Sequence, residues 1–393
     1  MRILVASHTY TVDLNCEKLR AIANLEPGIE VTVVVPRCWQ PGGVQSQLVM
    51  SQPSASGTFR LVPCSNFSQN HQGLLWFGAD VVSLLRQFRP QIIQVEQGAK
   101  SLAYAELITL NRVLKLGAKN LFFTWWNLPY RLKFPTAQLE AYNLRHTNGA
   151  IAGNRDAADV LHQRGYRGAL QVLPQLGVDE RRFYPQPQPQ LRAELGIRPN
   201  EFVVGYVGRF VEEKGLLTVA KALAGLRDVA WRWLLVGRGD LKARLMQQAT
   251  DLGIGDRLIW VESVPHAEVP RYLNAMDALV LASQTTNQVQ TLTASGWKEQ
   301  FGHVLIEAMA CRVPVIGSDS GEIPHVIGQA GLVFPEGNAD ALREQLRSLF
   351  HHPDQAANLA QQGYERAIAH YTNGVLARQQ LDFYKSLLAK DAQ

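Results

Sequence analysis

Two glutamates eight residues apart, Glu299 and Glu307, mark the stretch of the chain whose residue types and spacing suggest the most chemistry. Apolar runs lie on both sides of it, at 278–283 and 313–318. This pattern predicts a strand, a loop, a helix and a second strand. We expect Glu299 to lie in the loop and Glu307 to lie one to two turns inside the helix.

The start of that predicted helix, Phe301-Gly302-His303-Val304, has the properties of an anion site. The first backbone N–H groups of a helix lack partners within the helix, and the helix dipole is positive there. Gly302 would let a ligand approach the backbone closely. The Glu307 carboxylate could accept hydrogen bonds from a ribose diol. A diphosphate at the helix start with a ribose beside it describes a nucleotide-sugar.

A second loop with chemically capable residues runs from Gly208-Arg209 to Lys214-Gly215. It follows an apolar run and precedes an amphipathic one, so it is predicted to join a strand to a helix. The guanidinium of Arg209 and the ammonium of Lys214 can together neutralise a leaving diphosphate. A surface pair bonded to Glu212 or Glu213 is the alternative. The glutamate pair later in the same half favours the ligand-binding interpretation.

Both stretches belong to a regular alternation of short apolar runs and amphipathic segments. In the first half the predicted strands are Ile3–Ser7, Val31–Pro36, Ile92–Val95, Asn120–Thr124 and Ala150–Ala152. In the second half they are Phe202–Tyr206, Trp233–Val236, Leu258–Trp260, Ala278–Leu281, Val313–Ile316 and Gly331–Phe334. This alternation is typical of α/β proteins with parallel, doubly wound sheets. Ligands of such sheets bind at the carboxyl ends of the strands, so two facing domains would place a cleft there.

The boundary between the halves is visible in the sequence. Prolines alternate with glutamines from Pro185 to Pro189, which favours an extended connector over a functional proline-rich ligand. We expect a Rossmann-like domain over 1–173, a second over 174–373, and a C-terminal helix over 374–393 that could pack back on the first domain.

Length and composition narrow the class of protein. The 393 residues are too many for one typical core, and 46% hydrophobic with 19% charged residues is ordinary for a globular protein. No apolar run reaches about 18 residues, so no transmembrane helix is predicted, and the first residues lack the features of a signal peptide. The four cysteines have no metal-ligand spacing, so we expect reduced thiols in a cytoplasmic protein.

The net charge of +5 is unevenly distributed along the chain. Residues 1–170 hold 17 lysines and arginines against 10 aspartates and glutamates, a net of +7, and the rest of the chain carries −2. A basic first half could attract the anionic lipids of a cytoplasmic membrane face or an acidic glycan. A solvated surface without a partner is an equal alternative. No nucleic-acid partner is expected, because no basic run is interleaved with stacking aromatics.

Together, Gly208-Arg209-Phe210, Lys214-Gly215 and Glu299-x7-Glu307 resemble the motifs of the retaining GT-B glycosyltransferases of family 4, the glycosyl transferases group 1. The resemblance spans essentially the whole chain and includes the phrase Glu307-Ala308-Met309-Ala310. It implies two facing Rossmann-like domains. It also implies transfer of a hexosyl unit, with retention of configuration, from a nucleotide-diphosphate sugar to an acceptor hydroxyl.

The resemblance also implies roles for individual residues. Arg209 and Lys214 would hold the donor diphosphate, Glu299 would lie at the donor sugar, and Glu307 would hold the ribose. Glu299, Arg209 and Lys214 are therefore the expected catalytic residues. The backbone of Phe301, Gly302, His303 and Val304 would contact the sugar and phosphates. Further donor-binding positions are expected at Gly208, Gly237, Val264 and Ser283, although Gly237 could belong to a plain turn.

The acceptor is expected in the first domain, where the sequence departs from the family. Many members carry a histidine after the strand 120–124, whereas this chain has Trp126 and Asn127, which puts a histidine-based role in doubt. Asn127 can bond a sugar hydroxyl and a tryptophan face can stack on a pyranose ring, but tryptophans filling the core are the competing interpretation. His8 and Glu96, which follow other predicted strands, are further cleft candidates. A structural role for His8 stays open.

In the implied mechanism negative charge grows on the leaving diphosphate, and preorganised cations and the helix start stabilise it. The leaving phosphate then accepts the proton of the acceptor, so no protein base is required. No Asp-x-Asp pair ends a predicted strand, so we expect no metal and no cofactor besides the donor. The long polar loop 284–297 is expected to be a flap over the donor or an inert insertion.

Three other functions stay open. A dinucleotide oxidoreductase would need a glycine-rich fingerprint where Ala6-Ser7-His8 follows the first strand. A nucleotide-sugar epimerase or hydrolase on the same fold would act without an acceptor. A non-catalytic nucleotide-sugar binding protein would bind the donor without converting it to a product. The sequence does not identify the sugar, the base or the acceptor, which could be a lipid, a glycan or a small molecule.

Overall fold

The computed structural model describes residues 1–40, 48–290 and 295–389. These residues form two compact units, of which the first holds residues 1–177 and the final segment from Asn373, and the second holds the described residues of 178–372. Each unit is built around a mainly parallel sheet, so the predicted α/β class is confirmed.

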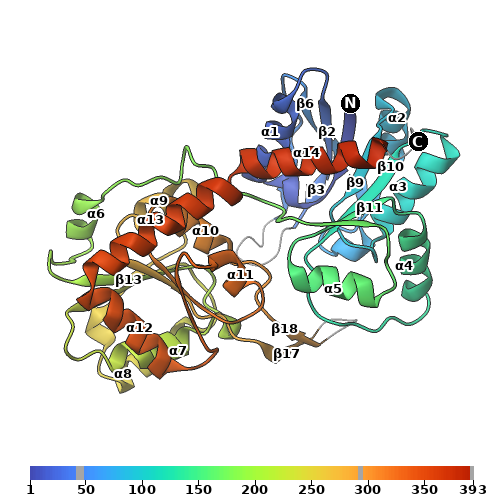
Figure 1. Cartoon of the computed structure of the whole chain (residues 1–393). Helices are drawn as coiled ribbons and strands as arrows, with labels where there is room; N and C mark the ends of the chain where they lie inside the picture. The colour runs from blue at the N-terminus through green and yellow to red at the C-terminus, as the bar shows by residue number, and fades with distance from the viewer. Residues whose placement is uncertain (41–47, 291–294, 390–393) are drawn as a thin grey trace. The chain divides into compact units, whose positions relative to one another are not determined.

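The first unit contains an eight-stranded sheet (Figure 1). Its order is β12 (Ala169–Val172), β11 (Gly149–Ala152), β10 (Lys119–Thr124), β9 (Ile92–Val95), β1 (Arg2–Ala6), β2 (Glu30–Pro36), β6 (Phe59–Cys64) and β5 (Ser54–Ser56). All neighbours pair in parallel except β5, which pairs with β6 in the antiparallel sense. The order of the strands along the chain reverses between β1 and β9.

Helices cover both faces of the first sheet because successive side chains of a strand point to opposite faces. Ile3 and Val5 of β1 belong to one buried cluster and Leu4 and Ala6 to another. The first cluster includes residues of α1 (Glu17–Leu25) and α14 (Asn373–Ala389), and the second those of α2 (Ala79–Phe88) and α3 (Leu102–Val113). The other helices of this unit are α4 (Thr136–Arg145) and α5 (Arg155–Gln163).

The last helix, α14, is part of the first unit and lies against α1 (Figure 1). Its buried residues Leu381, Tyr384 and Leu387 pack in the cluster of Ile3 and Val5. The Tyr384 hydroxyl also donates a hydrogen bond of 2.8 Å to Gln94 Oε1 on β9. The chain therefore uses its final helix to complete the core around its first strand.

The second unit contains a six-stranded sheet in which every pairing is parallel. Its order is β15 (Leu258–Val261), β14 (Trp231–Val236), β13 (Phe202–Val207), β16 (Ala278–Leu281), β19 (Val315–Ser318) and β20 (Leu332–Phe334). The order along the chain reverses between β13 and β16. This is the strand order of a Rossmann domain.

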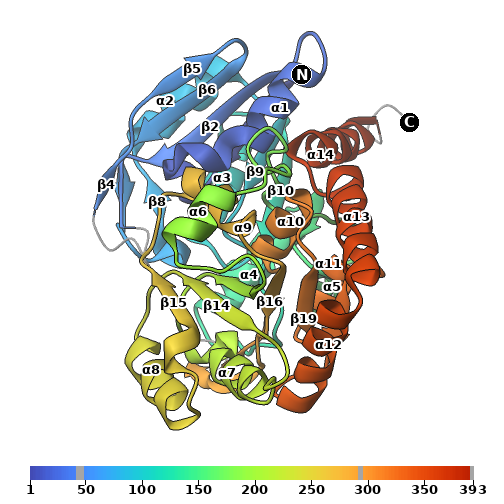
Figure 2. The ribbon, with the colours of Figure 1, turned by 90° about the vertical axis from the view of Figure 1, so that its left-hand side faces the viewer.

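Eight helices belong to the described part of the second unit. They are α6 (Pro189–Glu194), α7 (Leu216–Ala224), α8 (Lys242–Asp251), α9 (Val269–Leu273), α10 (His303–Ala310), α11 (Ile323–Ile327), α12 (Ala339–His351) and α13 (Pro353–His370). Figure 2 shows α12 and α13 near β19. Helix α12 contacts β20, and α13 contacts both β19 and α10.

Two local features differ from the sequence-based expectations. The described part of the polar segment 284–297 forms a hairpin of β17 (Thr286–Gln290) and β18 (Ser295–Trp297) instead of a loop. The strand expected at Val313–Ile316 begins two residues later, at Val315. Pro314 has no N–H to donate to a sheet, although its carbonyl accepts from Leu279 N at 2.9 Å.

Candidate functional site

The strongest candidate site lies where the strand order of the second sheet reverses, because open α/β sheets bind ligands at such switch points. Arg209 and Lys214 follow the carboxyl end of β13, and Ser283 follows the carboxyl end of β16. Glu299 comes next, after the hairpin and just before α10. The fold thereby gathers residues that are up to ninety positions apart in the sequence.

Lys214, Ser283 and Glu299 meet at one carboxylate oxygen. Lys214 Nζ lies 2.5 Å from Glu299 Oε2, and Ser283 Oγ donates to the same oxygen at 2.6 Å. Glu299 is only 6% exposed. Burial by itself would raise the pKa of Glu299, but the Lys214 charge and the two hydrogen bonds outweigh burial and hold the pKa below its ordinary value. Glu299 is therefore an anion at neutral pH.

Glycines allow the loops around this cluster to pack closely. Gly215 has a φ of +66°, and a Cβ there would lie 1.9 Å from the carbonyl oxygen of Ala282. A Cβ at Gly237, in the loop after β14, would lie 1.9 Å from the carbonyl oxygen of Gly208. The backbones of the loops after β13, β14 and β16 are thus in contact. Gly237 has no side chain to separate its loop from Gly208, a close approach that a plain turn would not require.

Arg209 is the more exposed of the two cations. Its guanidinium is 46% exposed and lies 3.8 Å from Glu213 Oε1, which is an ion pair longer than a hydrogen bond. The alternative interpretation, a surface pair with Glu212 or Glu213, therefore describes Arg209, which pairs with Glu213. It does not describe Lys214, which bonds to Glu299.

The start of α10 presents backbone rather than side chains. Its N-cap is Gly302, with a left-handed φ of +82° and no side chain to cap the helix. A Cβ there would lie 2.8 Å from Leu281 Cδ2. The neighbouring Phe301 is 4% exposed, and its ring packs on Tyr371 at 5.7 Å and on His303 at 4.8 Å. Phe301 therefore contributes its side chain to the core, while His303 and Val304 form the first turn.

Glu307, on α10, has a partner that sequence reasoning missed. His266 Nε2 lies 2.8 Å from Glu307 Oε1, and this hydrogen bond raises the pKa of His266. The His266 ring also packs on Phe183 at 5.3 Å. Val264, a predicted donor-binding residue, is half-buried in the loop that follows β15. His266 lies two residues after Val264, and this was the only feature of the sequence that pointed to a role for His266 at the site.

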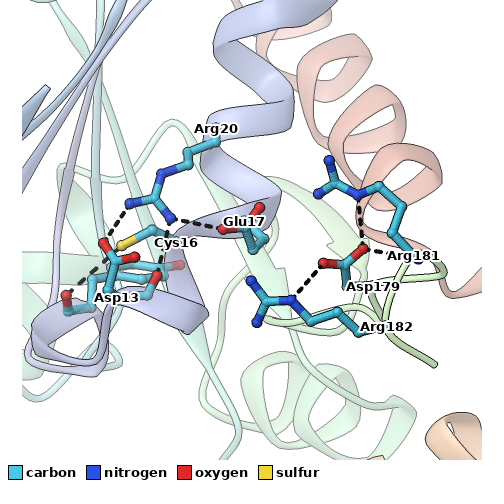
Figure 3. A network of polar contacts seen from close by, with 8 residues as sticks. Asp13, Cys16, Glu17, Arg20, Asp179, Arg181 and Arg182 are labelled. Atoms are coloured by element: carbon cyan, nitrogen blue, oxygen red, sulfur yellow. Dashed lines mark hydrogen bonds and ion pairs between the residues drawn. The ribbon is translucent and has the colours of Figure 1, made fainter. Parts of the chain in front are cut away.

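A nearby cation opposes this shift. The charge of Arg182 lowers the pKa of His266, although less than Glu307 raises it. Arg182 itself is paired with Asp179, 3.2 Å from Oδ2, and Arg181 Nε donates to Asp179 Oδ1 at 3.1 Å (Figure 3). In the first unit, the same figure shows Arg20 of α1 bonded to Asp13 and Glu17.

Trp297 is the second residue at the site that sequence reasoning did not select. It ends β18, two residues before Glu299, and is half-buried. Its ring centroid lies 5.0 Å from Lys214 Nζ. The residue was part of the segment expected to be a flap or an insertion, and the contact depends on the pairing of β18 with β17.

The first sheet also reverses its order, between β1 and β9, and Glu96 follows β9 there. Glu96 is 5% exposed, and its carboxylate accepts hydrogen bonds from the Tyr10 hydroxyl (2.6 Å), Gln94 Nε2 (2.7 Å) and Gln175 Nε2 (2.7 Å). Both oxygens thus already bind side chains of the same unit. The hydrogen bonds tie together the segment that follows β1, β9 and the segment that leaves β12.

His8 follows β1 and packs on the buried Trp39, with ring centroids 4.8 Å apart. Burial lowers the pKa of His8 to about 4. Its Nδ1 lies 3.4 Å from Gln97 Nε2. The imidazole is therefore neutral at physiological pH and is suited to accept a hydrogen bond rather than to carry charge.

Trp126 and Asn127 follow β10. The Trp126 indole donates to the Leu128 carbonyl at 2.6 Å, and the ammonium of Lys100 lies 4.0 Å from its ring centroid. The same ammonium lies 3.8 Å from the ring centroid of Tyr130. Asn127 is 4% exposed. The Trp126 ring is thus engaged by a cation of its own unit.

Within residues 1–40, 48–290 and 295–389, no group of three or more histidine, cysteine, aspartate or glutamate side chains is arranged to hold a metal ion. None of the helices described there is both long enough and apolar enough to cross a bilayer. Cys16, Cys38, Cys64 and Cys311 are free cysteines.

Comparison with known proteins finds a family match within the second unit. Residues 187–366 match the family described as glycosyl transferases group 1. N-acetyl-alpha-D-glucosaminyl L-malate synthase of Bacillus anthracis is 28% identical over 217 residues, which are 54% of this chain and 53% of that protein. A GDP-mannose-dependent alpha-(1-6)-phosphatidylinositol monomannoside mannosyltransferase of Mycolicibacterium smegmatis is 31% identical over 214 residues, 52% of this chain and 53% of that one. The chain thus spans about half the length of the curated relatives it matches.

Solved structures extend the similarity to the whole fold. Sucrose-phosphate synthase from Thermosynechococcus elongatus superposes with a TM-score of 0.71 at 20% identity, over 99% of this chain and 100% of that one. Anabaena Alr3699/HepE in complex with UDP gives a TM-score of 0.71 at 18% identity, over 98% of this chain and 100% of that one. At these identities the likeness concerns the fold. The chain therefore carries a glycosyl transferases group 1 domain at residues 187–366, within the α/β fold of the GT-B glycosyltransferases.

Proposed function

We propose that this chain is a retaining glycosyltransferase that moves a hexosyl unit from a nucleotide-diphosphate sugar to an acceptor hydroxyl. One observation supports this most strongly. Lys214, Ser283 and Glu299 converge on one carboxylate oxygen at the switch point of a sheet that belongs to a glycosyl transferases group 1 domain. The second unit is then the donor domain and the first unit the acceptor domain.

In this proposal the two cations bind the donor diphosphate. Arg209 is exposed enough to reach a ligand, and Lys214 is held beside Glu299. The positive end of the α10 dipole adds a partial positive charge. Glu299 would accept from a hydroxyl of the donor sugar, and Glu307 from the ribose. The hydrogen bond from His266 leaves Oε2 of Glu307 available for that second task.

The chemistry balances without a protein base. The bond between the anomeric carbon and the diphosphate oxygen breaks, and its electron pair stays on the phosphate. The acceptor oxygen forms the new bond on the same face of the sugar and gives its proton to the leaving phosphate. Arg209, Lys214 and the start of α10 stabilise the charge that develops on the phosphate, so the proposed reaction is metal-independent.

The relatives suggest donors and acceptors to test. One is named as GDP-mannose-dependent, and a structural neighbour was solved with UDP. UDP- and GDP-sugars are therefore the first donors to try. The words phosphatidylinositol monomannoside in a relative's name make a lipid acceptor one candidate to test. The net charge of +7 on residues 1–170 would suit contact with the anionic cytoplasmic face of a membrane.

The donor site can be tested by thermal stabilisation of wild type and Glu307→Ala with UDP, GDP, ADP and their sugar conjugates. A ligand that binds only the folded state stabilises it by about 2.7 kcal/mol at a concentration of 100 Kd. We expect one nucleotide series to raise the melting temperature of wild type, and the mutant to lose most of that shift.

Two outcomes would contradict the proposal. If no nucleotide stabilises wild type, the donor site is wrong. If a nucleotide-sugar binds but yields only free sugar or an epimer with every lipid, glycan and small-molecule acceptor tried, the activity is hydrolysis or epimerisation rather than transfer. Addition of EDTA is the matched control for metal-independence, because a metal-dependent reaction would stop and recover with Mn²⁺ or Mg²⁺.

A further inference from the structure

The ammonium of Lys214 lies close to an aromatic face as well as to a carboxylate. Its Nζ is 5.0 Å from the ring centroid of Trp297 and 2.5 Å from Glu299 Oε2. A cation within about 6 Å of the centroid of an indole ring is attracted by the ring quadrupole. Because the Lys214 side chain is only 15% exposed, water screens this attraction less than it would at an open surface.

The hairpin fixes the Trp297 ring relative to the loop that carries Lys214. Trp297 pairs with Thr286 across the two strands. Just before Thr286, the backbone N–H of Gln284 donates to the Glu213 carbonyl at 2.8 Å, and its side chain donates to Thr218 Oγ1 at 2.7 Å. The base of the hairpin is therefore bonded to the residue next to Lys214.

A second anchor holds the same base to the loop after β20. The backbone N–H and the hydroxyl of Thr285 donate to the two carboxylate oxygens of Glu336, at 2.6 and 2.7 Å. The Glu336 N–H donates in turn to Asp319 Oδ1 at 2.8 Å. With both anchors in place, the start of the hairpin is fixed at the carboxyl edge of the sheet.

A carboxylate and an aromatic ring hold an ammonium differently. Glu299 takes one N–H group of Lys214, and a diphosphate would compete for the same hydrogens. A π face attracts the charge as a whole, so it can keep the ammonium in place while phosphate oxygens take the N–H groups. We propose that Trp297 is a positioning residue that holds Lys214 at the donor diphosphate. This inference rests on the proposed function, because it requires that Lys214 binds the diphosphate.

Calorimetric affinities for UDP and GDP would test the proposal in wild type, Trp297→Leu, Trp297→Phe, Lys214→Met and the Trp297→Leu/Lys214→Met double variant. Leucine keeps an apolar side chain but removes the ring. We expect Trp297→Leu to weaken binding about 2- to 30-fold, and Trp297→Phe to weaken it less. In the Lys214→Met background Trp297→Leu should have no further effect. The KM for the donor should rise by the same factor, with a smaller change in kcat.

The control is Lys242→Met, which removes another lysine that lies over a tryptophan in the described part of this unit, 5.5 Å from the ring centroid of Trp260. It should bind nucleotides as wild type does. Equal weakening by Trp297→Leu with and without Lys214 would overturn the proposal, because the tryptophan would then act independently of the lysine. Unchanged affinity in Trp297→Leu would also overturn it.

A ligand-free measurement separates this inference from the proposed function. The ring current of Trp297 should shift the side-chain NMR resonance of Lys214 in isotope-labelled protein, and Trp297→Leu should move that resonance. If wild type binds no nucleoside diphosphate, the proposed function fails, and the role of Trp297 at the diphosphate fails with it. If nucleotides bind but the Lys214 resonance is the same in Trp297→Leu, only the positioning role of Trp297 is overturned.

Discussion

At the scale of single residues, Glu299 fixes the electrostatics of the candidate site. A buried carboxylate would ordinarily have a raised pKa, yet Lys214 and Ser283 hold the pKa of Glu299 below its usual range. The charge of Glu299 in turn orients the Lys214 ammonium through a bond of 2.5 Å. Replacing Glu299 by glutamine would therefore disturb the cation as well as the carboxylate, so loss of activity in that variant would not by itself assign a role to either.

The pair of His266 and Glu307 leads to a prediction about pH. The hydrogen bond to Glu307 raises the pKa of His266 in the folded state, so the pair adds stability below about pH 6.5, the ordinary histidine pKa. That stability is lost as the pH rises through the raised folded-state pKa. Because His266 is 49% exposed, we expect only a few tenths of a kcal/mol, as for a solvated ion pair.

Urea unfolding at about pH 5.5 and about pH 8.5 would measure this effect in wild type, His266→Gln, Glu307→Gln and the double variant. The difference in unfolding free energy between wild type and His266→Gln should be larger at the lower pH. It should lose its pH dependence in the Glu307→Gln background. A difference that is the same at both pH values would mean that the two side chains are not coupled.

At the scale of elements, α14 leads to a prediction about stability. Leu381 is fully buried among residues of β1, β2 and α1. Truncating a buried leucine to alanine removes apolar contacts and leaves a cavity, at a cost of about 2–5 kcal/mol. We expect Leu381→Ala to lower the unfolding free energy of the first unit by that amount, measured by denaturant unfolding.

The neighbouring Asp382 provides the matched control. It lies on the exposed side of the same helix, so Asp382→Ala should change the unfolding free energy by no more than about 0.5 kcal/mol. If Leu381→Ala were as mild as Asp382→Ala, α14 would not be an integral part of the core around β1.

The elements also show what could be predicted from sequence. Buried parallel strands are nearly continuous apolar runs, and the ranges predicted for β9 and β16 agree with the structure. The hairpin of β17 and β18 was missed because Thr286–Gln290 is largely polar and its pairing depends on tertiary contacts. For the same reason the contacts of His266 with Glu307 and of Trp297 with Lys214, which join distant segments, left no trace in local spacing.

At the scale of the whole molecule, the two units offer different environments for ligands. At the switch point of the second sheet, Arg209 and Lys214 follow β13, and Lys214 is bonded to Glu299, which comes just before α10. At that of the first sheet, Glu96 is bonded to Tyr10, Gln94 and Gln175, and His8 is neutral. An anionic nucleotide is therefore expected in the second unit, and an uncharged or weakly polar group suits the first.

Hydrogen exchange with and without the stabilising nucleotide tests this assignment over the whole chain. A bound ligand slows exchange where it removes local opening of the backbone. We expect the largest slowing in the loops after β13 and β16 and in the first turn of α10. In Glu307→Ala, at a nucleotide concentration that saturates only wild type, the slowing should disappear from these loops. If the largest slowing fell in the loops after β1, β9 or β10 instead, the nucleotide would bind the first unit, and the assignment of donor and acceptor domains would have to be reversed.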